Sequence, residues 1–146
     1  MRKYIMIFFV IGFISCEEEN PEMYMVDLDD FRIQLPNTWS ASRLQGYDSF
    51  VGQITINQSE VIFFDLGWYS DKLQVDPETH VISFVVIDNK NAKIVSPKNF
   101  GLGTVGIYFD SLEVTKTNKF QMSGTNLSSA NQKLFLDALK TMRFKE

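Results

Sequence analysis

The spacing of the apolar residues is the feature that most limits what this chain can fold into. Over residues 31–35, FRIQL, apolar and polar side chains alternate without a break, as in a strand with one buried face. Residues 49–57 alternate similarly, and residues 39–43 are expected to be extended. Residues 61–68, VIFFDLGW, are apolar almost throughout apart from Asp65, which predicts a central strand covered on both faces. The chain is therefore expected to fold around a sheet.

The middle of the chain continues the strand pattern. Residues 81–87 are rich in β-branched side chains, and residues 88–91 are turn formers that tolerate positive φ. Because residues 92–95 then return to an extended pattern, this stretch predicts a hairpin. Two further strands are predicted over residues 104–109 and 119–122.

Two connections in this part of the chain carry predictions of their own. Residues 69–78, with Pro77, are interpreted as a polar connection between strands. The glycines at 101, 103 and 106 predict a turn or bulge and a close approach between backbones. They do not predict a dinucleotide-binding loop, because a strand rather than a helix follows them.

The end of the chain has a helical pattern. Residues 129–132, SANQ, fit a capping box in which the Ser129 hydroxyl and the Gln132 amide bind exposed backbone N–H groups. A basic tail over residues 143–146 suits the negative end of the helix dipole. Apolar residues recur on one helix face with a period of 3.6, at Leu134, Phe135, Ala138, Leu139 and Met142. The predicted fold is α+β, a twisted antiparallel sheet of about six to seven strands with a C-terminal amphipathic helix on one face.

The first residues have the composition of an export signal. Met1-Arg2-Lys3 is followed by an uncharged apolar stretch over residues 4–14. A membrane-spanning helix needs about 20 apolar residues, whereas the apolar part of a signal peptide has this shorter length. Residues 1–15 are therefore expected to be a signal peptide.

Residues 13–16, Phe-Ile-Ser-Cys, resemble the lipobox of bacterial lipoproteins, with Phe13 in the place where leucine is usual. The resemblance implies that the Cys16 thiol is acylated, with palmitate or a similar chain, and becomes the first residue of the mature protein. Two or more acyl chains anchor a protein stably without a transmembrane helix. The alternative is an ordinary secretory signal followed by an incidental cysteine.

The acidic residues after Cys16 bear on location. Glu17-Glu18-Glu19 resembles the export signal of surface lipoproteins in Bacteroidetes-type bacteria, which implies an outer-membrane lipoprotein of the cell envelope, exposed at the surface or not. An acidic second residue elsewhere implies retention at the inner membrane, and a run of like charges also makes a solvated tether. We expect residues 16–23 to form the lipidated tether and residues 24–146 a single domain.

Charge and cysteine content exclude several functions. Without Arg2 and Lys3, 12 of the 14 basic residues remain against 18 acidic ones, a net charge of about −6. No basic patch of the kind that binds nucleic acid is present. With Cys16 acylated, no thiol is left for a disulfide, a zinc site or a nucleophile. We expect no metal and no cofactor.

Two stretches at the ends of the domain resemble PsbP-like domains. Residues 31–39, FRIQLPNTW, resemble the opening strand of that group, and residues 131–144, NQKLFLDALKTMRF, resemble its closing helix. The resemblance implies a twisted antiparallel sheet with helices on its faces. Residues 46–54, GYDSFVGQI, and 63–71, FFDLGWYSD, are similar to small uncharacterised lipoproteins of Bacteroidetes-type bacteria. PsbP-like domains serve as binding or assembly modules in unrelated settings, so the fold does not determine the function.

Three acidic residues are candidates for acid–base chemistry or calcium binding: Asp48, Asp65 and Asp71. The competing interpretation is structural, because Asp48 and Asp71 lie in predicted loops where a carboxylate caps nearby N–H groups. Asp65 interrupts an apolar strand, so if buried it should be paired with Arg, Lys or several N–H donors.

Aromatic residues provide a second candidate site. Tyr47, Trp68 and Tyr69 could form an exposed platform for a glycan or a peptide, although in a chain with 13 Phe, 5 Tyr and 2 Trp most aromatic residues pack in the core. His80, the single histidine, has no companions for a zinc site. No G-x-S-x-G motif accompanies it as a sign of a catalytic triad, and it is interpreted as an edge residue.

These observations leave three hypotheses about function. The leading one is a membrane-anchored, non-enzymatic domain that binds or helps to assemble another envelope component, a protein or a glycan. The second is a small hydrolase that uses Asp48 and Asp65. The third is a carbohydrate- or peptide-binding module that uses Tyr47, Trp68 and Tyr69. A deep pocket with convergent acids would favour the enzyme, and an exposed aromatic patch would favour the binding module.

Overall fold

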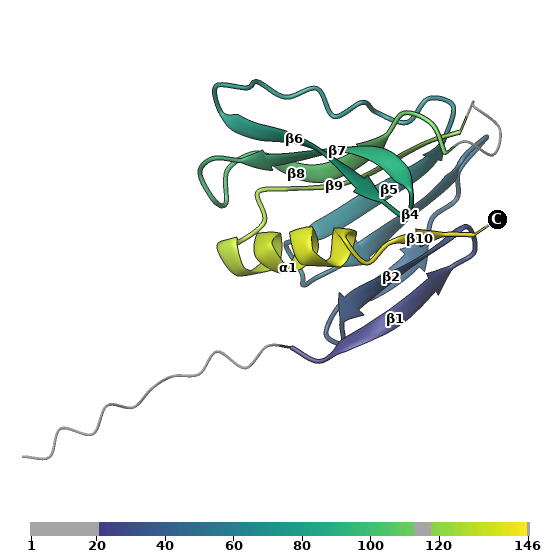
Figure 1. The fold of residues 1–146 in the computed structure, drawn as a ribbon. Coiled ribbons are helices and arrows are strands. Elements are labelled where there is room, and N and C mark those ends of the chain that lie inside the picture. Colours follow the sequence, from purple (N-terminus) through teal and green to yellow (C-terminus); the bar gives the residue numbers. More distant parts are fainter. Residues whose placement is uncertain (1–20, 113–117, 146) are drawn as a thin grey trace, which may run out of the picture.

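The computed structural model describes residues 21–112 and 118–145. Cys16, the predicted signal peptide and the first part of the predicted tether lie outside these residues. The described chain forms a mixed α+β fold with a large sheet, a small sheet and the helix α1 near the C-terminus (Figure 1). The predicted class, an antiparallel sheet with a C-terminal helix, is therefore confirmed.

Seven antiparallel strands form the large sheet, in the order β3-β4-β5-β9-β8-β7-β6. Each predicted strand except that of residues 31–35 is present in it, with ends shifted by a few residues. The bounds are β3 Ser40–Arg43, β4 Phe50–Thr55, β5 Val61–Gly67, β6 His80–Ile87, β7 Lys90–Pro97, β8 Thr104–Phe109 and β9 Lys119–Thr125.

A small sheet, β1-β2-β10, was not predicted as a separate sheet. It pairs β2 (Phe31–Pro36) with β1 (Met23–Leu28) on one side and β10 (Arg143–Phe144) on the other. The prediction that residues 143–146 form a basic tail on the helix dipole is wrong for the described part. Phe144 instead packs edge-to-face on Phe109 and Phe120, with ring centroids 5.0 and 5.6 Å away, and this contact draws the chain into the small sheet.

The helix α1 (Ser129–Leu139) begins one residue earlier than the predicted cap requires. Ser128 is the N-cap, and its hydroxyl accepts a hydrogen bond from the Asn131 N–H at 3.4 Å. The predicted capping box is wrong because the N-cap is Ser128 in place of Ser129, and Gln132 is buried. Its Oε1 has no hydrogen-bond partner among the described residues. The helix α1 has eleven residues. Within residues 21–112 and 118–145, the structure contains no helix that could span a membrane.

Glu60, from the turn between β4 and β5, replaces the missing half of the cap. Its Oε1 accepts the Ser128 N–H at 2.5 Å, and its Oε2 accepts the Asn131 and Asn57 side-chain amides at 2.7 and 2.6 Å. Burial by itself would raise the pKa of Glu60, but these hydrogen bonds outweigh burial and lower the pKa below its ordinary value of 4.5. The first turn of the helix is thus held to the large sheet by a carboxylate.

The core lies between the large sheet and the layer made by α1 and the small sheet (Figure 1). Phe31 of β2 packs edge-to-face on Phe64 and Phe120 of the large sheet, with ring centroids 5.3 and 5.0 Å away. The predicted alternation of β2 is confirmed, since its inward side chains are fully buried. From the helix, Phe135, Ala138 and Leu139 enter the same core. We call this side of the large sheet the inner face.

The opposite, outer face of the large sheet is covered only in part. Residues 68–79 connect β5 to β6, and on the way Leu73 packs on Val95 of β7 and Tyr108 of β8. The interpretation of residues 69–78 as a merely polar connection is therefore incomplete. Phe63, on the outer face of β5, stays half exposed. The prediction that β5 is covered on both faces is wrong, because the connection passes over β7 and β8 and leaves Phe63 open.

Candidate functional site

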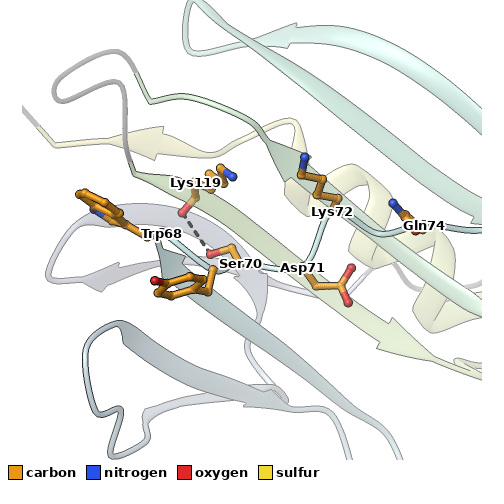
Figure 2. Close-up of a pocket in the computed structure, with 7 residues that line it drawn as sticks. Trp68, Ser70, Asp71, Lys72, Gln74 and Lys119 are labelled. Atoms are coloured by element: carbon orange, nitrogen blue, oxygen red, sulfur yellow. Dashed lines mark hydrogen bonds between the residues drawn. The ribbon is translucent and has the colours of Figure 1, made fainter.

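The candidate site forms at the end of β5, where a tight turn presents two aromatic side chains. Ser70 is buried, and its hydroxyl lies 3.0, 3.2 and 3.3 Å from the carbonyl oxygens of Asp65, Gly67 and Lys119 (Figure 2). These contacts hold the turn against β9. Trp68 and Tyr69 precede Ser70 and are directed to solvent, with exposed fractions of 62% and 85%.

A second loop, residues 44–49, closes against this turn because two glycines leave room for it. A Cβ atom at Gly67 would lie 2.6 Å from the Ser49 Cβ, and one at Gly46 would lie 2.2 Å from the Ser49 carbonyl oxygen. Neither separation is possible for real atoms, so a larger residue at Gly67 would push the loop away. The close approach brings Asp48 beside Asp65.

Three adjoining hollows meet at Trp68, which lines all of them. The acidic hollow, of about 270 Å³, is lined by Asp48, Ser49, Asp65, Trp68 and Tyr69. The lysine hollow, of about 420 Å³, is lined by residues 68–72, Gln74 and Lys119 (Figure 2). The loop hollow, of about 510 Å³, includes Tyr47, Asp48 and Arg43 in its wall.

Asp65 is the unusual member of the site. Its Oδ1 atom is buried and has no hydrogen-bond partner within the described part of the chain. The expectation that a buried Asp65 would be paired is wrong for this oxygen. An unsatisfied buried acceptor costs on the order of 1–3 kcal/mol, and such groups call for a functional explanation. The Asp65 side chain lines the acidic hollow, although its Oδ1 atom has almost no surface exposed to solvent.

The structure brings the five predicted binding residues together. Asp48, Asp65, Trp68 and Tyr69 line the acidic hollow, and Tyr47, fully exposed, lines the loop hollow next to it. They come from two chain segments that the β4–β5 hairpin places side by side.

Sequence reasoning missed several residues that line the hollows, among them Ser49, Lys72 and Lys119. Ser49 directly follows Asp48, and Lys72 directly follows Asp71, so their positions in the sequence could have indicated them. Lys119 is the first residue of β9, and only the pairing of β5 with β9 brings it there.

Asp71 and His80 have structural roles. The Asp71 carboxylate accepts the Leu73 N–H at 2.6 Å, as expected of a loop aspartate. His80 is the first residue of β6, and its Nε2 accepts the Thr104 N–H at 3.2 Å while its Nδ1 lies 2.9 Å from the Thr79 hydroxyl. Among residues 21–112 and 118–145, no group of three or more His, Cys, Asp or Glu side chains is placed to hold a metal ion.

Lys93 holds the connection that forms one wall of the lysine hollow. Its ammonium group donates hydrogen bonds to the Lys72 carbonyl and, at 3.0 Å, to the Leu73 carbonyl. Burial lowers the pKa of Lys93, and the nearby Asp71 carboxylate opposes this effect. Beneath it, the Tyr108 hydroxyl donates to Asp110 at 2.7 Å, and burial together with this contact raises the pKa of Tyr108. The wall of the hollow is therefore fixed to the outer face.

Comparison with known proteins assigns no family to this chain. Neither a scan against protein-family models nor a search of the curated proteins gives a match. The function is therefore inferred from the chemistry of the chain's own residues.

The geometry of the hollows favours binding over catalysis. The acidic hollow, which contains both carboxylates, has a volume of about 270 Å³ and opens beside two larger hollows. Its aromatic walls are exposed rather than closed over a reacting atom, so water is not excluded. Exposed rings beside hydrogen-bond acceptors suit a ligand that is apolar on one face and polar at its rim.

Proposed function

We propose that this chain is a lipid-anchored protein of the bacterial cell envelope whose domain binds saccharides at the hollows around Trp68. The observation that carries the proposal is the meeting of two exposed aromatic rings, Trp68 and Tyr69, with two acidic residues, Asp48 and Asp65, in the lining of one hollow. The protein acts as a binding module and not as a hydrolase.

The chemistry of a sugar ring matches each part of the site. A pyranose has an apolar C–H face, which stacks on rings such as Trp68 and Tyr69. Its hydroxyl groups donate hydrogen bonds, which the carboxylates of Asp48 and Asp65 accept as charge-assisted bonds. In the neighbouring hollow, Lys72 and Lys119 supply donors for the oxygens of the next sugar unit. A chain of two or three sugars would span adjoining hollows.

The lipid anchor rests on the lipobox-like residues 13–16. Acylation of Cys16 would tie the domain to the outer membrane through the tether 16–23, with the acidic run after Cys16 favouring export to the surface. Mass spectrometry of protein recovered from its own cells should find the Cys16 sulfur acylated and residues 1–15 removed. An unmodified thiol or an intact leader would contradict the anchor but would leave saccharide binding untouched.

We further propose that the domain is PsbP-like in type. The two stretches that resemble this group form β2 and its following turn, and α1 with β10. They lie next to each other, since the Gln34 N–H donates to the Thr141 hydroxyl at 2.9 Å. Such a domain serves to bind or to assemble other components, in agreement with a non-enzymatic role.

Saccharide binding is tested by titration against a defined panel. Calorimetry with soluble oligomers of β-1,4-linked glucose, N-acetylglucosamine, mannose and a uronic acid should show binding to at least one. Trp68→Ala should weaken that binding about 10-fold or more, because truncating an aromatic anchor at a binding site costs over about 1 kcal/mol. Phe100→Ala is the matched control, since Phe100 is about as exposed but lies outside the hollows. Equal loss in both variants, or no binding in the panel, would contradict the proposal.

Hydrolysis is checked in the same samples. If Asp48 and Asp65 were a catalytic pair, the bound oligosaccharide would be shortened during incubation, and Asp65→Asn would stop the cleavage. We expect the oligosaccharide to remain intact with the unmodified chain.

A further inference from the structure

The strand β6 is an open edge of the large sheet (Figure 1). Its eight residues, HVISFVVI, include no charged residue and no proline. Val81, Ile82, Phe84 and Val86 are all exposed, Phe84 to 80%. Proteins normally protect an edge strand with charges, proline, a bulge or a short length, and β6 has none of these protections. An edge of this kind is suited to pairing with another strand.

The turn at the end of β6 determines which backbone groups face the open edge. Asp88 and Asn89 form a two-residue turn with φ values of 50° and 59°. In such a hairpin the flanking residues, Ile87 and Lys90, exchange two hydrogen bonds. Because hydrogen-bonded and non-hydrogen-bonded pairs alternate along antiparallel strands, every second residue of β6 directs its backbone groups to β7.

The remaining residues direct their N–H and C=O groups outward. They are Ile82, Phe84 and Val86, which pair with β7 residues at the non-hydrogen-bonded positions. Their side chains share the outer face, because residues two apart in a strand point the same way. The open edge therefore combines outward-facing backbone hydrogen-bonding groups with three exposed apolar side chains.

We propose that β6 pairs antiparallel with β6 of a second copy of this chain, about a twofold axis at Phe84. This register places Phe84 opposite Phe84 and Ile82 opposite Val86, so the outward backbone groups of both copies meet. It leaves Ser83 opposite Val85, and it brings Asp88 opposite His80 of the other copy. No two like charges face each other along the strand, and the two large sheets become one continuous sheet.

The self-complementary register favours a second copy over an unrelated partner. A twofold interface requires that one surface fit itself, and the uncharged, apolar β6 meets this condition over its whole length. A stable interface buries about 800 Å² per partner. One paired edge with four exposed apolar side chains provides less, so we expect a dimer of micromolar affinity.

Sedimentation of the full chain in mild detergent tests the dimer. The unmodified chain should shift from monomer to dimer over the micromolar range. Phe84→Lys should remain monomeric, because the axis would place two ammonium groups face to face, and an equimolar mixture of Phe84→Lys and Phe84→Glu should recover the dimer. Phe100→Lys, which adds the same charge outside β6, should dimerise normally.

Cysteine pairs test the register and do not depend on Phe84. The double variant Ser83→Cys, Val85→Cys should form intermolecular disulfides between positions 83 and 85 when oxidised in its native envelope, since non-hydrogen-bonded pairs lie about 4.5 Å apart at Cα. Ser83→Cys alone should not cross-link to itself. A chain that stays monomeric throughout, a Phe84→Lys variant that still dimerises, or a 83–83 cross-link would overturn the proposal.

Discussion

Phe63 and Phe64 are neighbours in β5, yet they lie in opposite surroundings. Phe64 is 1% exposed on the inner face, where it contacts Phe31 and Phe50. Phe63 is 50% exposed on the outer face, beyond the reach of the connection that packs over β7 and β8. The same residue type in the same strand is thus part of the core on one side and of an open surface on the other.

The difference between the two faces explains where the candidate site lies. The inner face is covered by a complete second layer, α1 and the small sheet, and its side chains have no surface left for a ligand. Asp65 alternates with Phe64 and so shares the outer face with Phe63. Because a single connection covers only part of this face, Asp65 lies on the side of the sheet where an aromatic ring, Phe63, stays half exposed.

The largest expected effect comes from Phe64→Ala. Removing a fully buried aromatic side chain leaves a cavity and should lower the free energy of unfolding by about 3–5 kcal/mol. Phe63→Ala, its control on the outer face, should change it by less than about 1 kcal/mol. Urea unfolding followed by circular dichroism measures both, and similar losses would show that the faces are packed alike.

Leu73→Ala tests whether the outer face has a core of its own. Leu73 is buried against Val95 and Tyr108, so the variant should lose about 2 kcal/mol of unfolding free energy. Gln74→Ala, next to it and exposed, should lose almost none. If Leu73→Ala proves neutral by thermal unfolding, the connection does not stabilise the outer face.

Glu60 makes the attachment of α1 to the large sheet depend on pH. Because the pKa of Glu60 is lowered in the folded state, its contribution to the free energy of unfolding is fully present above pH 4.5. This contribution is lost as the pH falls through the folded-state pKa. Glu60→Gln should cost about 1 kcal/mol at pH 7. The difference from the unmodified chain in urea unfolding should shrink below pH 4.5, and a constant difference down to pH 3 would contradict the role of the charge.

The smallest expected effect on stability is that of Asp65→Asn. This change alters a carboxylate whose buried Oδ1 atom has no hydrogen-bond partner among the described residues, so the unfolding free energy should stay the same or rise by up to about 1 kcal/mol. Saccharide binding, by contrast, should fall in the calorimetric titration. A clear loss of stability would instead indicate that Asp65 is paired in solution and serves the fold.

Most strands could be predicted because their signals are local. Alternation in residues 31–35 and the β-branched run before Asp88 each identify a strand from a few neighbouring residues. The small sheet escaped prediction since β1 is exposed at Met23, Tyr24 and Met25 and so lacks clear alternation. β10 has only two residues, and its position depends on ring contacts made by Phe144.

The candidate site was predictable in part. The five predicted residues stand in two short segments whose unusual composition is visible locally, and the hairpin between them brings the segments together. The helix cap was predicted wrongly, because Glu60 reaches it from a distant turn and allows Gln132 to be buried. Contacts between residues far apart in sequence leave no periodic signal.

The sequence by itself determined the kind of each main element, since the period of apolar residues and the turn formers act over a few neighbours. Only the tertiary structure decided which face of the large sheet is covered, that Lys119 joins Trp68, and that the Asp65 Oδ1 atom finds no hydrogen-bond partner in the described part of the chain. The physical reason is that burial is a property of layers packed together, and which segments pack is set by the sum of contacts across the whole chain.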